Sequence, residues 1–196
     1  MGLDFELKQL LYVPNIIDYA RLLFLWISLQ PGYNFAVWYA GSYLLDAFDG
    51  IAARQLNQCS KLGYYLDMVI DRISSCICLH VAAEAMINLG PQYAWTAPIF
   101  YALLVFVEVI AHGVVTYYAE VKGVHQKLMG HEYKVVQLYL GNKGVLFLAC
   151  AGFEAFNISL IMGWYHLALL AAPWMIFRAF ANLLRLWACL NLPKSE

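Results

Sequence analysis

Long apolar stretches separated by short polar connections make up most of this chain. The stretches lie at residues 15–30, 34–55, 61–88, 93–119, 136–162 and 165–190. A helix needs about 20 apolar residues to cross the hydrocarbon core of a bilayer, so each stretch is close to the length of one crossing. The pattern therefore predicts an all-α, polytopic membrane protein whose six transmembrane helices occupy residues 14–190 of a single domain, 1–196.

The first 13 residues follow a different pattern. Leu3, Leu7, Leu10 and Leu11 fall on one helical face, while charged and amide side chains occupy the others. An amphipathic pattern of this kind is typical of a helix that lies on the membrane surface. We therefore expect a short interfacial helix at residues 1–13, and a cytosolic tail at 191–196 after the last crossing.

Composition supports a membrane protein and argues against several other classes. Hydrophobic residues make up 63% of the sequence and charged residues 13%, whereas about a quarter of the residues in a soluble domain are charged. The net charge of −1 gives no reason to expect a nucleic-acid partner, and the five cysteines lack the spacing of a zinc site. Lysine and arginine are absent from the connections near residues 31, 90 and 163, so the positive-inside rule places both termini in the cytosol.

Four aspartates interrupt the second and third apolar stretches. Asp46 and Asp49 lie one helical turn apart, and Asp67 and Asp71 share a face of the next predicted helix. The short connection at 54–61 makes these helices antiparallel neighbours, so the four carboxylates can converge near the cytosolic boundary. A charged side chain in a membrane-spanning helix costs about 2.5–3.5 kcal/mol on insertion scales, so four acids in this place require an explanation.

Divalent cations provide one explanation for the acids. Carboxylate oxygens are hard ligands that suit Mg2+ or Mn2+, and four carboxylates can hold two ions. Paired ions predict phosphoryl chemistry, because they neutralise a phosphate and position the attacking and leaving groups. The plainer alternative is that Arg54 and Arg72, the basic residues closest in sequence, neutralise structural acids. Gly50 and Gly63 favour a ligand site, since glycine inside a helix costs about 1 kcal/mol, although tight helix packing also uses small residues.

The spacing of these residues matches a known pattern. Its fixed positions are Asp46-x2-Asp49-Gly50-x2-Ala53-Arg54-x8-Gly63-x3-Asp67-x3-Asp71. At every one of these positions the chain resembles the signature of the CDP-alcohol phosphotransferases. The flanking residues resemble most closely the eukaryotic members of that family that make phosphatidylinositol. The likeness is close over residues 13–73 and is weaker, though colinear, beyond them.

The resemblance implies a reaction, a set of residue roles and a cellular setting. The reaction would transfer the phosphatidyl group of CDP-diacylglycerol to myo-inositol, giving phosphatidylinositol and CMP. The enzyme would be a homodimer with six spans per chain, in the endoplasmic reticulum or Golgi, with its active site facing the cytosol. Two Mg2+ or Mn2+ ions would be held by Asp46, Asp49, Asp67 and Asp71, and Asp71 would also be the general base. Contacts to CDP-diacylglycerol would come from Gly50, Ala53, Arg54, Ser60 and Gly63.

Outside the motif, several residues have two interpretations each. Asp18 and Arg21 lie one turn apart in the first stretch, so Asp18 is either an ion-pair partner of Arg21 or a contact for the ligand. Lys143 either binds a polyol acceptor or extends to the membrane interface. Arg178, deeper in the sixth stretch, is a second candidate for the acceptor pocket.

Two rival functions fit part of the pattern. A sister enzyme would carry the same four aspartates but take glycerol 3-phosphate, serine or choline as its acceptor. A phosphorylated acceptor requires converging basic residues, whereas Lys143, Arg178 and Arg185 are scattered. A carboxylate-lined cation transporter belongs to a different class, and it requires acids spread along a path through the membrane. Here the acids crowd one end of two helices. Glu108 and His112 in the fourth stretch could bind a metal or satisfy each other.

Overall fold

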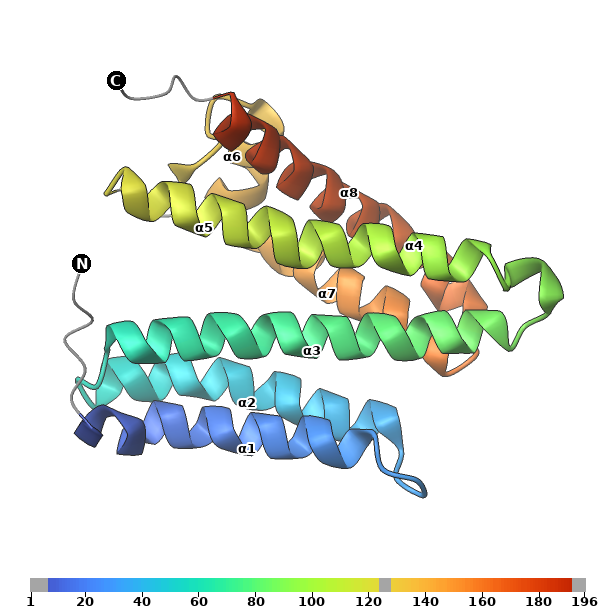
Figure 1. Ribbon diagram of the computed structural model, residues 1–196, viewed down its shortest axis with the longest axis horizontal. Helices are drawn as coiled ribbons and strands as arrows, with labels where there is room; N and C mark the ends of the chain where they lie inside the picture. The colour runs from blue at the N-terminus through green and yellow to red at the C-terminus, as the bar shows by residue number, and fades with distance from the viewer. Residues whose placement is uncertain (1–6, 124–127, 192–196) are drawn as a thin grey trace. The chain divides into compact units, whose positions relative to one another are not determined.

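The computed structural model describes residues 7–123 and 128–191, and within these ranges the chain forms helices and turns but no strand. Its α-helices are α1 (Val13–Ser28), α2 (Phe35–Gln55), α3 (Lys61–Ile87), α4 (Thr96–Val105), α5 (His112–Val121), α6 (Lys134–Gly141), α7 (Lys143–Ile161) and α8 (Tyr165–Leu190). The chain divides into two compact units, Met1–Ile77 and Cys78–Glu196, so that α3 belongs to both. Figure 1 labels the helices of each unit.

Several helices have the length and composition needed to cross a membrane. Among the described residues, three helical segments are long and apolar enough to cross a bilayer: Thr96–Val121, Lys143–Ile161 and Tyr165–Leu190. The helix α1 has 16 residues, which is short for a crossing of about 20 residues, and α2 and α3 carry the four aspartates of the motif. The all-α fold is therefore confirmed, with three segments that could cross a membrane, while six crossings remain a prediction.

The two ends of the chain are described only in part. Residues 1–6 of the predicted interfacial helix, residues 192–196 of the predicted tail, and His125 lie outside the described residues. What is described before α1 is a 3-10 helix, η1 (Leu7–Leu11), rather than an α-helix. Leu7 and Leu11 on this helix are exposed, and the membrane-surface position remains a prediction.

In the first unit, side-chain caps and a short connection bring three helix ends together. The connection from α2 to α3 turns at Asn57, whose φ of 53° lies in the left-handed region. Next to it, Gln58 Oε1 accepts a hydrogen bond from the backbone N–H of Val13 at 2.8 Å, which ties this connection to the start of α1. Ser60 then caps α3, because its hydroxyl oxygen accepts a hydrogen bond from the Gly63 N–H at 3.0 Å. The start of α1, the end of α2 and the start of α3 therefore lie at one end of the unit.

The second unit is built on one interrupted helix and one close helix pair. Helices α4 and α5 are joined by a π-helical segment, η3 (Phe106–Ala111), and the three form a continuous rod in Figure 1. Helices α7 and α8 pack closely at Gly152, where a Cβ atom would lie 2.3 Å from the Cβ of Trp174. The core of this unit includes the buried cluster Leu79, Leu104, Phe153 and Met175.

The predicted fifth crossing at 136–162 is not one continuous helix. Asn142 has extended backbone angles (φ −107°, ψ 110°) and separates α6 from α7. Its side-chain oxygen accepts hydrogen bonds from the N–H groups of Gly144 at 2.9 Å and Val145 at 3.2 Å. The expectation of an unbroken helix was wrong because asparagine is a strong N-cap, and an apolar pattern alone does not reveal a cap inside it.

Candidate active site

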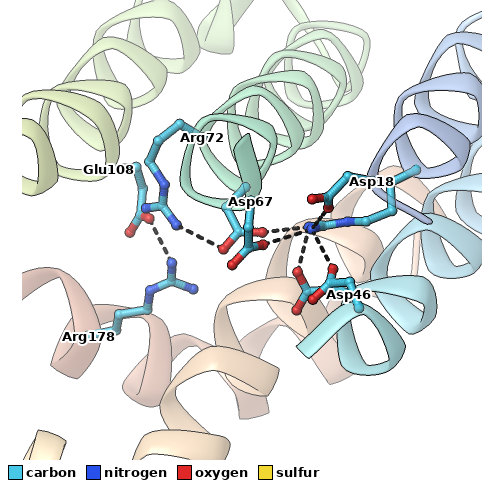
Figure 2. Close-up of polar contacts among 9 residues, drawn as sticks. Asp18, Asp46, Asp67, Arg72, Glu108 and Arg178 are labelled. Atoms are coloured by element: carbon cyan, nitrogen blue, oxygen red, sulfur yellow. Dashed lines mark hydrogen bonds and ion pairs between the residues drawn. The ribbon is translucent and has the colours of Figure 1, made fainter. Parts of the chain in front are cut away.

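Arg21 of α1 lies at the centre of the acidic residues of the first unit. Its guanidinium contacts five carboxylates, which come from α1, α2 and α3 (Figure 2). Its Nη1 lies 3.0 Å from Asp18 Oδ1, 3.1 Å from Asp49 Oδ2 and 2.9 Å from Asp67 Oδ1. Its Nη2 lies 2.5 Å from Asp46 Oδ1 and 2.6 Å from Asp71 Oδ1. The four aspartates of the motif therefore share one cation.

Helical spacing explains how two helices present two acids each to the same point. Residues three or four apart lie on one helical face, which aligns Asp46 with Asp49 on α2 and Asp67 with Asp71 on α3. The helix α1 packs closely against α2, and the buried hydroxyl of Ser42 on α2 donates a hydrogen bond to the carbonyl of Arg21 at 3.2 Å. The arginine is thus fixed at the height of the acids.

The cluster is closed on one side and accessible on the other. The side chains of Arg21 and Asp18 are each 2% exposed and that of Asp49 is 9% exposed. By contrast, the side chains of Asp46 and Asp71 are each 36% exposed and that of Asp67 is 42% exposed. A ligand can therefore reach the acids from α2 and α3 without displacing the α1 side of the cluster.

The acids are arranged in two groups that suit divalent cations. Carboxylate oxygens of Asp18, Asp49 and Asp67 lie within 4.8 Å of one another, and so do those of Asp46, Asp67 and Asp71. Each group offers three hard oxygen donors, the kind that Mg2+ and Mn2+ prefer. The guanidinium serves as a stand-in cation for this test, because Nη1 contacts the first group and Nη2 contacts Asp46 and Asp71. The donor set fits two such ions.

A pocket of about 180 Å³ adjoins the first group of acids. Its lining includes three small residues of the motif, Gly50, Ala53 and Gly63, and the nearby Ser60. At Gly63 a Cβ atom would lie 3.0 Å from Asn15 Oδ1, so glycine allows α1 and α3 to approach closely here. Arg54 does not line this pocket; it is exposed, and its Nη1 lies 3.3 Å from where a Cβ of Gly50 would be.

Proximity in sequence was a poor guide to the counter-ion. Arg54 and Arg72 were the alternative considered as counter-ions, but Arg21 contacts all four motif acids, across 25 to 50 residues of sequence. Arg72 Nη2 lies 3.8 Å from Asp71 Oδ2. The available signal was a basic residue inside an apolar stretch, which is rare and has to find acidic partners.

In the second unit, the structure places the two candidate acceptor residues differently. Lys143 is exposed at the first position of α7. Arg178 of α8 is 6% exposed, and its Nη2 donates a hydrogen bond to Glu108 Oε2 of the π-helical segment at 2.7 Å (Figure 2). Its guanidinium also lies 4.3 Å from the centre of the Phe153 ring, a cation–π contact. Glu108 therefore has an arginine partner that its sequence neighbours did not indicate.

The chain therefore combines apolar helices that could cross a membrane with a shared cluster of carboxylates that could hold divalent cations. Residues 11–189 match the CDP-alcohol phosphatidyltransferase family. The match covers most of the chain, so the protein belongs to this family.

Known relatives agree with this assignment. The chain is 36% identical over 159 residues to the CDP-diacylglycerol–inositol 3-phosphatidyltransferase of Schizosaccharomyces pombe, which covers 77% of the chain and 63% of that relative. It is 31% identical over 192 residues to the protein of the same name in Candida albicans (90% and 79%). It is 36% identical over 152 residues to the human protein of that name (74% and 68%). No solved structure matches the chain.

Proposed function

We propose that this protein transfers the phosphatidyl group of CDP-diacylglycerol to myo-inositol, giving phosphatidylinositol and CMP. Its family membership and the shared name of its relatives support this reaction. The observation that carries the proposal is the gathering of the four motif acids on one guanidinium, beside a pocket lined by the small motif residues.

In the proposed site, Asp46, Asp49, Asp67 and Asp71 hold two Mg2+ or Mn2+ ions. The two groups of carboxylate oxygens support this assignment. When bound, two such ions neutralise phosphate charge and stabilise the attacking and leaving oxygens of an in-line displacement. In the described residues, the acids have far more negative charge than Arg21 alone can balance.

The proposed nucleotide contacts are Gly50, Ala53, Ser60 and Gly63 in the pocket and Arg54 beside it. A whole ligand of this size usually occupies about 300–1,000 Å³, so a pocket of about 180 Å³ would hold only part of CDP-diacylglycerol. Arg54 is exposed next to Gly50, where its planar guanidinium could bind two oxygens of the pyrophosphate. The acyl chains would remain in the lipid.

Asp71 is the proposed general base. Its carboxylate is 36% exposed, with Oδ1 bonded to Arg21 at 2.6 Å and Oδ2 at 3.8 Å from Arg72. It would take the proton from an inositol hydroxyl while that oxygen forms a bond to the phosphorus that carries diacylglycerol. The bond from this phosphorus to the bridging pyrophosphate oxygen breaks, and CMP leaves with the electron pair. Positioning of the two substrates would supply much of the rate.

For the acceptor we propose Lys143 and Arg178 as contacts. Lys143 is exposed at the start of α7 and can donate to hydroxyl groups. Arg178 is charge-compensated by Glu108, so its remaining N–H groups would bind a neutral polyol rather than a phosphate. This charge balance favours inositol over glycerol 3-phosphate.

We further propose that the chain is one domain with six crossings, forms a homodimer, and faces the cytosol of the endoplasmic reticulum or Golgi with its active site and both termini. The distribution of lysine and arginine supports this orientation. Three apolar helices account for half of the proposed crossings. The remaining three would be α1, α2 and α3.

The decisive experiment supplies purified protein in detergent with CDP-diacylglycerol, Mn2+ or Mg2+, and one labelled acceptor at a time. We expect inositol to enter the lipid fraction with release of an equal amount of CMP. Incorporation of glycerol 3-phosphate, serine or choline without inositol would overturn the acceptor assignment and leave the chemistry intact. Release of no CMP with any acceptor would overturn the reaction itself.

A further inference from the structure

Asp18 of α1 is a fifth acid in the cluster and is not part of the family motif. It is 1% exposed, and its Oδ1 lies 3.0 Å from Arg21 Nη1. The same nitrogen is shared by Asp49 and Asp67. Because this one nitrogen contacts three carboxylates, Asp18 does not form an isolated ion pair with the arginine one turn away.

The contacts of the two guanidinium nitrogens follow nearly the same grouping of the five acids as their mutual distances do. Oxygens of Asp18, Asp49 and Asp67 lie within 4.8 Å of one another, and these three surround Nη1. Without Asp18, this group would hold only two carboxylates. With it, each of the two groups has three oxygen donors, and Asp67 belongs to both.

Formal charge points in the same direction. The five carboxylates in contact with Arg21 leave an excess of four negative charges over its one positive charge. Two divalent cations carry four positive charges and would cancel this excess. Uncompensated charge away from water is costly, so the closed α1 side of the cluster favours a cation close to Asp18.

A second observation on α1 points to a ligand at the same place. Asn15, one turn before Asp18, is fully buried, and its Oδ1 has no hydrogen-bond partner. Its Nδ2 donates to the carbonyl of Gln9 at 2.6 Å, which holds the amide in place. Both Asn15 and Asp18 line the pocket next to Asp49 and Asp67. A buried acceptor without a partner costs about 1–3 kcal/mol, and a cation or a ligand donor in this pocket would offset that cost.

We propose that Asp18 is a fifth carboxylate of the metal centre, and that it binds the divalent cation held by Asp49 and Asp67. The centre then draws ligands from α1 as well as from α2 and α3. This proposal rests on the metal site of the proposed function. It makes α1 part of the cation-binding machinery instead of a support for Arg21.

The test measures Mn2+ binding to the purified full-length protein without substrate, by calorimetry and by electron paramagnetic resonance. We expect two Mn2+ ions in the wild type, and in Asp18→Asn a loss of affinity for one of them by at least about tenfold, since even outer-shell changes cost 10–100-fold. Asp49→Asn should weaken the same ion. Glu84→Gln, which removes an exposed acid paired with His80, is the matched control and should bind both ions as the wild type does.

Thermal unfolding in EDTA separates the two roles of Asp18. A metal ligand predicts that Asp18→Asn is at least as stable as the wild type without metal, because one of five like charges is gone. Lower stability in EDTA together with unchanged Mn2+ affinity would show that Asp18 only supports Arg21 and would overturn the proposal. Asp18→Ser removes the carboxylate with less volume and tests the same affinities if the asparagine variant does not fold. If the wild type binds no Mn2+, the metal site of the proposed function fails as well.

Discussion

Two buried arginines in this protein differ in the number of carboxylates that they contact. In the second unit, Arg178 pairs with Glu108 at 2.7 Å and lies over the ring of Phe153. In the first unit, Arg21 is shared by five aspartates. The first arrangement is balanced in charge and resembles a structural ion pair. The second arrangement has more acids than one cation can balance, as the proposed metal site requires.

The largest effect is expected from the exposed side of the unbalanced cluster. Asp71→Asn should lower phosphatidyl transfer by about 10²–10⁴-fold, the usual contribution of a general base, while folding is preserved. The measurement is CMP release by purified protein, with unfolding followed in parallel. The control is Glu84→Gln, which should transfer normally. Turnover within threefold of the wild type would remove Asp71 as the base.

Breaking the ion pair between Arg178 and Glu108 should lower the stability of the protein. Glu108→Ala leaves the buried Arg178 without its carboxylate, and breaking such a pair costs about 3–5 kcal/mol. The double variant Glu108→Leu with Arg178→Met removes both charges and should recover most of this loss. Unfolding in detergent measures all three proteins. Equal stability of the single and double variants would show that the pair is not coupled.

Removing the shared arginine should have a smaller effect that depends on metal. Arg21→Gln leaves five aspartates without their common donor, at a cost of about 1–3 kcal/mol in EDTA, because part of the cluster is open to water. Mn2+ should then raise the melting temperature of this variant more than that of the wild type.

The matched control for that experiment is Arg54→Gln. Arg54 is exposed, so this change should alter stability by less than about 0.5 kcal/mol. If Arg21→Gln behaved in the same way in EDTA, the guanidinium would not be holding the acids together.

The last comparison takes one glycine from each unit. Gly152→Ala would bring a Cβ within 2.3 Å of Trp174 Cβ, and overpacking of this kind costs about 1–3 kcal/mol. Gly63→Ala meets Asn15 Oδ1 at 3.0 Å, and the better helix propensity of alanine, worth about 1 kcal/mol, offsets this contact.

For Gly63→Ala we therefore expect near-normal stability and a several-fold higher KM for CDP-diacylglycerol. For Gly152→Ala we expect lower stability and an unchanged KM for CDP-diacylglycerol. An unchanged KM in Gly63→Ala would separate this glycine from the nucleotide pocket.

Much of the fold could be predicted because it follows from local rules. Apolar length predicted where the helices lie, and the turn residues marked most of their ends. The break at Asn142 and the π-helical segment at Phe106–Ala111 were missed. An apolar pattern is the same whether or not a helix is interrupted, since capping and π-helical hydrogen bonds depend on geometry rather than on hydrophobicity.

The sequence by itself determined the helical membrane fold and the four aspartates, because the 3.6-residue period places residues of one helix on a common face. Only the tertiary structure decided what stands between those acids. Arg21 and Asp18 come from a helix that the motif does not include, and the contacts of Arg21 with the four motif acids cross 25 to 50 residues of chain. Helical periodicity relates neighbours along a single helix, whereas the partner of a buried charge is chosen by the packing of several.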